Sequence, residues 1–228
     1  MMTTVKICGL KDKATVEAIL HLPIDHIGFL FAKSKRQVTP GEAGEMIRVI
    51  HERRAAGQPV PLTVGVFVDP SRELLAEVMR EAPLDVVQLH GSESPDFCRW
   101  VKMTFGVLVY RVFSVTDTGP DQAGELGNVL DPYAGQIDGL LLDTAGGGTG
   151  KTFEWNRIPA YHAWTVRNRI PLLVAGGLHP DNVAGLIGSY PLDGVDVSSG
   201  VETDGTKDIA KITAFVERVK RHESHASA

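Results

Sequence analysis

The sequence has few cysteines and no long hydrophobic run. Cys8 and Cys98 are its only two cysteines, and neither lies in a paired Cys/His spacing that would build a zinc site. No uninterrupted stretch of about 18 apolar residues occurs, and the first ten residues, MMTTVKICGL, lack the apolar region of a signal peptide. We therefore expect a cytoplasmic protein with no bound metal and no membrane partner.

Positive charge is also scarce. The 23 lysines and arginines are outnumbered by 28 acidic residues, so the formal net charge is -5 and no broad basic surface is available for nucleic acid. The chain of 228 residues is 43% hydrophobic, which is enough for one substantial core. We expect a single domain over residues 1–222, followed by a small, polar, flexible tail at residues 223–228.

Eight short apolar segments rich in β-formers alternate with stretches of helical spacing. The expected strands are residues 5–10, 26–32, 62–69, 85–91, 107–115, 139–144, 171–177 and 194–200. The expected helices include residues 12–22, 41–56, 71–82, 94–105, 179–190 and 207–222. Strands that are apolar throughout indicate a parallel sheet covered by helices on both faces. Eight such units favour a closed (β/α)8 TIM barrel in the α/β class, with an open doubly wound sheet as the alternative.

Polar and glycine residues gather directly after the expected strands. In a barrel these positions share the C-terminal face, where active sites of this fold are built. After the seventh and eighth strands, Gly176, Gly177 and Gly200 would let backbone N–H groups approach an anion, which suggests a phosphate site. The alternative is that these glycines only permit tight turns.

Three further side chains at strand ends have the chemistry of an active site. Cys8 ends the first strand near Lys6, where it could act as a thiolate or simply pack as a small hydrophobe. Asp143 ends the sixth strand and could hold a proton at the rim or anchor a loop. Arg36 has the planar fork that binds carboxylates, whereas Asp196 is ambiguous between the pocket and the barrel interior.

The segment AGGGTGKT, residues 145–152, nearly matches the phosphate-binding loop of nucleotide hydrolases, with alanine in place of the first glycine. Such a loop should open directly into a long helix. Here bulky residues and Pro159 follow within one or two turns, so the sequence disfavours a nucleotide site.

Taken together, the segments KICG, GFLFAKSKRQV, VGVFVD, VQLHG, LLLDTAGGGTGKTFEW, LVAGGL and DVSSGVE resemble phosphoribosylanthranilate isomerase of tryptophan biosynthesis, over residues 5–202. The resemblance implies an aldose–ketose isomerase that performs an Amadori rearrangement on a small phosphorylated substrate and needs no cofactor. It also implies that Cys8 is the general base, that Asp143 is the general acid, and that the glycine-rich loop after the sixth strand is a mobile loop of the active site. The pKa of the base should then be lowered and that of the acid raised.

The same resemblance assigns the binding residues. Arg36 would hold the anthranilate carboxylate, and Asp196 would approach the sugar hydroxyls. Gln88 and His90 belong to a recurrent motif of the family and are expected at the substrate, although His90 could be a hydrogen-bonding residue without a catalytic duty. The phosphate would be bound by Gly176, Gly177, Ser199 and Gly200.

Other functions remain open at this stage. The related isomerase of histidine biosynthesis uses two carboxylates, so KICG favours the tryptophan branch without excluding dual specificity. A non-catalytic phosphosugar-binding barrel or a nucleotide-dependent switch would fit the fold as well. The outer helices do not distinguish a monomer from a homodimer.

Overall fold

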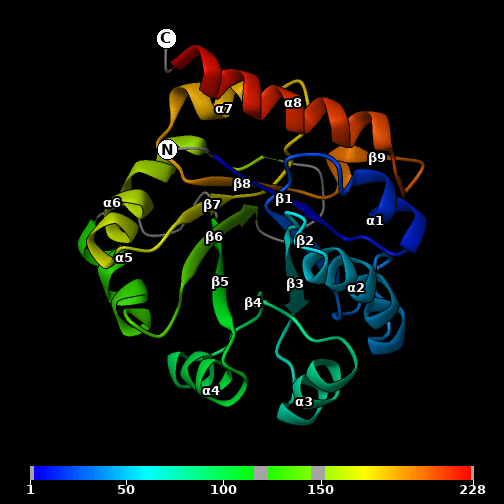
Figure 1. Ribbon diagram of the computed structural model, residues 1–228. Helices are drawn as coiled ribbons and strands as arrows, with labels where there is room; N and C mark the ends of the chain where they lie inside the picture. The colour runs from blue at the N-terminus through cyan, green and yellow to red at the C-terminus, as the bar shows by residue number, and fades with distance from the viewer. Residues whose placement is uncertain (1–2, 116–122, 145–151, 227–228) are drawn as a thin grey trace.

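The structure is a computed structural model that describes residues 3–115, 123–144 and 152–226. Eight parallel strands form a closed barrel in chain order, with helices around its outside (Figure 1). The strands are β1 (Thr4–Cys8), β2 (His26–Leu30), β3 (Leu62–Phe67), β4 (Val86–Leu89), β5 (Leu108–Val115), β6 (Gly139–Thr144), β7 (Leu172–Val174) and β8 (Gly194–Val197). Closure is decided by β1, which pairs with β8 from Thr4 with Gly194 to Ile7 with Val197. The expected (β/α)8 barrel is confirmed, and the open sheet is excluded.

The helices that alternate with these strands begin with side-chain caps where the sequence supplies them. They are α1 (Lys13–Ile19), α2 (Pro40–Ala55), α3 (Arg72–Glu81), α4 (Pro95–Phe105), α5 (Ala123–Leu130), α6 (Ile158–Asn168), α7 (Val183–Ser189) and α8 (Ile209–Ala226). Asp12, Ser71 and Ser94 each accept a backbone N–H from the first turn, and Thr39 forms a capping box with Glu42. All six helices named from the sequence are present, and α8 continues beyond residue 222, where we predicted the domain to end. That boundary remains a prediction.

Two helices and several short elements were not expected. α5 and α6 were missed, and Pro159, which we took as a helix breaker, lies in the first turn of α6. Proline fits there because the first helical N–H groups have no partner within the helix. Short 3-10 turns occur at η1 (Asp131–Tyr133), η2 (Trp155–Arg157) and η3 (Ser199–Val201), and β9 (Glu202–Thr203) pairs with β10 (Thr206–Lys207).

Hydrophobic side chains fill two separate spaces. The larger cluster lies between the strands and the surrounding helices, and it includes Ile7, Ile27, Phe29 and Phe215. A smaller cluster fills the barrel interior, where Val64, Val86, Tyr110, Val112, Leu141, Leu173 and Ala175 meet. The inner cluster forms a floor beneath the ends of the strands.

Four aspartates link neighbouring strands by hydrogen bonds at the N-terminal end of the barrel. Each stands just before a strand and accepts a backbone N–H from the preceding strand. The bonds join Asp25 to Val5 (2.7 Å), Asp85 to Thr63 (2.8 Å), Asp138 to Val109 (3.0 Å) and Asp193 to Leu172 (2.8 Å). These acids therefore stabilise the N-terminal end of the barrel, which is the face that serves stability rather than catalysis in this fold.

Candidate active site

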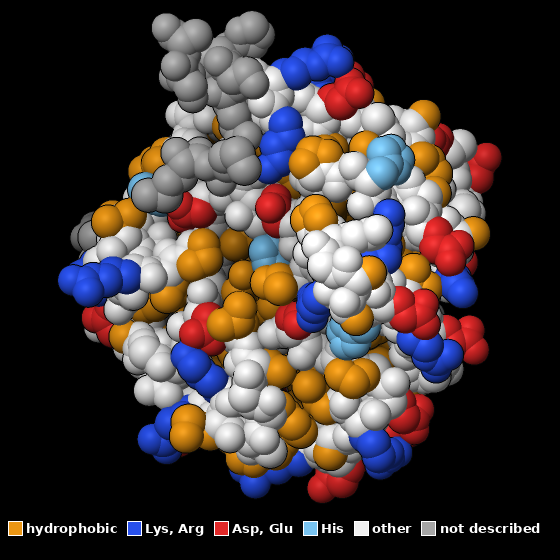
Figure 2. All heavy atoms as spheres, in the orientation of Figure 1, with side chains coloured by type: hydrophobic (Ala, Val, Ile, Leu, Met, Phe, Trp, Pro, Cys, Tyr) orange, Lys and Arg blue, Asp and Glu red, His pale blue; other side chains and the backbone are white. Residues whose placement is uncertain are grey.

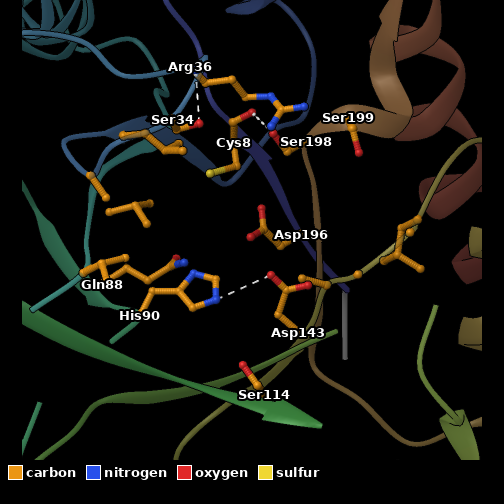
Figure 3. Close-up of a pocket in the computed structure, with 18 of the residues that line it drawn as sticks. Cys8, Ser34, Arg36, Gln88, His90, Ser114, Asp143, Asp196, Ser198 and Ser199 are labelled. Atoms are coloured by element: carbon orange, nitrogen blue, oxygen red, sulfur yellow. Dashed lines mark hydrogen bonds and ion pairs between the residues drawn. The ribbon is translucent and has the colours of Figure 1, made fainter. Parts of the chain in front are cut away.

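A cavity of about 360 Å³ opens at the C-terminal ends of the strands (Figure 3). Because alternate side chains of a barrel strand point inward, each strand tip can deliver one or two residues to it. All eight strands contribute a lining residue in or directly after the strand: Cys8, Leu30, Val66, Gln88, Ser114, Asp143, Ala175 and Asp196. Its size is typical of a small-molecule site.

The predicted acid and base open onto this same cavity. Cys8 and Asp143 lie on opposite sides of it in Figure 3, and Asp196 lies between them. His90 lies beside Asp143, with 3.6 Å between Nε2 and the carboxylate Oδ2. The sequence therefore placed these four residues at one site, although they come from β1, β6, β8 and the end of β4.

Asp143 has the raised pKa that a general acid needs. Burial raises its pKa to about 6, although a 2.7 Å hydrogen bond from the Thr144 backbone N–H acts in the opposite direction. Burial also lowers the pKa of His90 to about 4, so the imidazole facing Asp143 is neutral near neutral pH. Asp143 thus has no charged histidine beside it that would favour its ionised form.

The expectation of a lowered pKa at Cys8 is wrong for the unliganded protein. Burial raises the pKa of the thiol, and this outweighs the charges of Lys6 and Lys207, which act to lower it. Cys8 is only 7% exposed, so few water molecules can solvate a thiolate there. Near neutral pH Cys8 is therefore mainly the neutral thiol.

Arg36 is at the cavity, but part of its fork is already occupied. Its Nε and Nη2 donate to the two carboxylate oxygens of Glu202 at 2.5 and 2.9 Å, and both side chains are only 6% exposed. Lys207 Nζ donates to the same carboxylate at 2.9 Å. Burial acts to raise the pKa of Glu202, but these two cations lower it to about 2. Only the remaining Nη1 side of Arg36 is left for a second carboxylate.

Three of the four residues predicted to bind phosphate, Gly176, Gly177 and Ser199, line the cavity. Gly176 and Gly177, at the end of β7, line the cavity together with Ser198 and Ser199 at the end of β8. Gly176 has a φ of 85°, and a Cβ at this position would overlap the Thr144 hydroxyl, so a side chain is excluded twice. Gly200 does not line the cavity, because it packs directly against the Leu178 carbonyl oxygen. It brings the two loops together behind the site.

Further residues belong to the site without having been assigned a role from the sequence. Lys33, Ser34 and Ser198, which lie in the polar segments after the second and eighth strands, line the cavity. Glu202 and Lys207 support it from β9 and β10. Elements of two residues leave no periodic signal, so nothing in the sequence predicts that hairpin.

The glycine-rich segment 145–151, predicted to be a mobile loop of the active site, lies outside the described residues.

The chain was compared with known proteins. The family model of N-(5'-phosphoribosyl)anthranilate (PRA) isomerase matches residues 5–218. The chain belongs to the phosphoribosylanthranilate isomerase family. A relative from Brevibacillus brevis, named N-(5'-phosphoribosyl)anthranilate isomerase, is 44% identical over 230 residues, which are 99% of this chain and 97% of the relative.

Solved structures of the family have the same fold. Monomers of the dimeric phosphoribosylanthranilate isomerase from Thermotoga maritima match with a TM-score of 0.76 and 32% identity, over 96% of this chain and all of theirs. A phosphoribosylanthranilate isomerase in complex with reduced 1-(o-carboxyphenylamino)-1-deoxyribulose 5-phosphate matches with a TM-score of 0.74 and 31% identity, again over 96% of this chain and all of the other.

The resemblance seen in the sequence is thus confirmed, and the chain is an isomerase of tryptophan biosynthesis. This excludes the nucleotide-dependent switch and the non-catalytic barrel as its main role.

None of the helices in the described residues is long and apolar enough to span a membrane. Figure 2 shows Lys and Arg side chains interspersed with Asp and Glu on the face it presents, without one continuous basic patch.

Proposed function

We propose that Cys8 and Asp143 perform the two proton transfers of the phosphoribosylanthranilate isomerase reaction. The observation that carries this proposal is their common cavity, in which a thiol and a carboxyl group with a pKa of about 6 face one another across the space for a sugar. Both reach the cavity from strand tips, which hold catalytic groups more rigidly than loops do.

The steps follow from the bonds that must change. Asp143 gives its proton to the ribose ring oxygen while the C1–O bond breaks, and the anthranilate nitrogen lone pair forms a C1=N iminium. The Cys8 thiolate then takes the proton from C2, the C–H pair becomes a C1=C2 bond, and the iminium electrons return to nitrogen. The resulting enol then gains a proton at C1 and loses the proton of its C2 hydroxyl, which gives the C2 ketone of the product and balances the two protons moved in the earlier steps. Since electrons only move within one molecule, the rearrangement balances without an external oxidant or reductant.

Unpartnered polar atoms support a sugar between the two catalytic groups. Gln88 Oε1 and Asp196 Oδ1 are buried and have no hydrogen-bond partner within the described residues. Both residues line the cavity, and a buried acceptor without a donor is costly. Sugar hydroxyls are the donors that would satisfy them.

We propose that Gly176, Gly177 and Ser199, which line the cavity after β7 and β8, bind the phosphate group of the substrate. Gly200 serves as a packing residue.

We further propose that the protein acts in the cytoplasm on this small phosphorylated substrate, as a monomer or a homodimer. The direct test is loss of phosphoribosylanthranilate fluorescence on addition of the purified protein. Fast loss with formation of the ribulose product supports the proposal, whereas binding without turnover contradicts it. The phosphoribosyl substrate of the related histidine-branch isomerase should be assayed in parallel, since its conversion would reveal dual specificity.

Replacement of Arg36 by lysine should raise KM far more than it lowers kcat. A lysine has no planar fork, so it cannot bind Glu202 and a substrate carboxylate in parallel. Loss of a charge-assisted hydrogen bond should raise KM by about ten- to a hundredfold. Steady-state kinetics measure this change. Arg167→Lys on α6 is the matched control, because Arg167 also pairs with a carboxylate, that of Asp131, but does not line the cavity. Equal KM values in both variants would contradict the assignment of Arg36.

A further inference from the structure

Lys6 is a fully buried cation in the barrel interior. Its side chain has no exposed surface, although a lysine is among the residues least often found inside a protein. Burial acts to lower the pKa of Lys6, yet the charges of Asp196 and Cys8 outweigh it and raise that pKa to about 12. The ammonium is thus charged, and its cost must be offset by specific partners.

A carboxylate and a thiol are arranged around this one cation. On β8, Asp196 is the register partner of Lys6, and its Oδ2 lies 2.9 Å from Lys6 Nζ. On β1 itself, Cys8 follows Lys6 by two residues, so both side chains point to the same inner face of the barrel. The ammonium therefore lies beneath the thiol and beside the carboxylate.

Gly28 on β2 makes this arrangement fit. It is the register partner of Cys8, and a Cβ at this position would lie 2.8 Å from Cys8 Sγ and 3.3 Å from Lys6 Nζ. The sulfur and the ammonium thus both border the same small space over the glycine. Any side chain there would push one of them away.

The other charged groups near Cys8 do not stabilise a thiolate as Lys6 does. Lys207, on β10, donates to Glu202 and to the Ser198 carbonyl oxygen, and Arg36 is bound by Glu202. Asp196 opposes thiolate formation, because a second negative charge would lie beside its own. Among the described residues, the largest electrostatic contribution in favour of the thiolate comes from Lys6.

We propose that Lys6 is a positioning residue whose ammonium is shared between Asp196 and Cys8 and stabilises the thiolate that removes the sugar C2 proton. This role rests on the proposed function of Cys8 as the base. It makes Lys6 and Asp196 act in opposite directions on the thiol, although they are partners in one ion pair.

The test measures the thiol itself. Cys98, the other cysteine, is replaced by alanine so that Cys8 is the single thiol, and its alkylation by iodoacetamide is followed from neutral to alkaline pH. In Lys6→Met, which keeps the length of the side chain, the alkylation rate at a fixed pH near 8 should fall by about tenfold, because one pKa unit changes the thiolate fraction tenfold. In Asp196→Asn the rate should rise instead.

The opposite signs separate this role from a structural one, since a loosened barrel would expose Cys8 and accelerate alkylation in both variants. An unchanged or faster rate in Lys6→Met, or a slower rate in Asp196→Asn, would overturn the proposal. If Lys6→Met does not fold, Lys6→Gln takes its place, because glutamine also lacks the charge but can still donate a hydrogen bond to Asp196, and the same fall in rate is expected. Turnover by Cys8→Ala tests the base separately, so failure of the Lys6 proposal cannot be mistaken for failure of the proposed function.

Discussion

Replacement of Cys8 by alanine is expected to lower kcat by about a hundred- to ten-thousandfold, because this is what a general base contributes to such a step. The sulfur faces the cavity from the tip of β1, and no other described residue with a titratable thiol lines that cavity. The loss of one buried sulfur should cost only about 1 kcal/mol of the free energy of unfolding. Turnover is measured by the fluorescence assay and stability by thermal unfolding.

Cys98 provides the matched control for this prediction. It is a buried cysteine on α4 that packs in the outer hydrophobic cluster and does not line the cavity. Cys98→Ala should therefore lose a comparable amount of stability and keep its turnover. If Cys8→Ala retained a kcat close to that of Cys98→Ala, the thiol would have no part in the removal of the C2 proton.

The repeating fold was readable from the sequence because each strand is apolar throughout and lies next to a helix with its own spacing. α5 and α6 were not predicted, because glycines interrupt the helical pattern of α5 and Pro159 lies in the first turn of α6. Closure of the barrel was only inferred, since pairing of β1 with β8 joins residues from the two ends of the chain. Local patterns carry no information about such a contact.

The site was predictable to the extent that strand tips share one face. That geometry correctly grouped Cys8 and Asp143 at one cavity, whereas it left Asp196 ambiguous and only the family resemblance placed that residue there. It gave no account of burial or of ion pairs between distant residues. Lys6 pairs with a residue 190 positions away, and Arg36 pairs with one 166 positions away. These contacts, and the desolvation that raises the pKa of Cys8, arise only when the barrel closes.

Replacement of Asp143 by asparagine should likewise lower kcat by about a hundred- to ten-thousandfold, because the amide cannot give a proton to the ribose ring oxygen. The variant keeps the shape of the side chain, so KM and the unfolding temperature should change little. Asp138→Asn is the control at the opposite end of the same barrel. That aspartate binds Lys102 and the Val109 N–H at the N-terminal face, so its loss should reduce stability and spare turnover. The reverse outcome would place the acid elsewhere.

The pH dependence of kcat/KM provides a second test of Asp143. Between its pKa of about 6 and the raised pKa of Cys8, the pair holds one proton, which lies mostly on sulfur. The reactive form, with the proton on Asp143 and a thiolate on Cys8, is then a small but constant fraction of the enzyme. Below pH 6 a second proton removes the thiolate, so kcat/KM should fall toward acid through Asp143's own ionisation.

In Asp143→Asn this acid limb near pH 6 should disappear, and the residual kcat/KM should instead climb into the alkaline range as Cys8 ionises. An unchanged limb near pH 6 would mean that another group titrates there. His90 is a poor candidate for that group, since burial lowers its pKa to about 4. Because the reactive fraction depends on the gap between the two pKa values, any contact that favours the thiolate raises kcat/KM across the whole plateau. The buried ammonium of Lys6, which borders Cys8 in the space over Gly28, is such a contact.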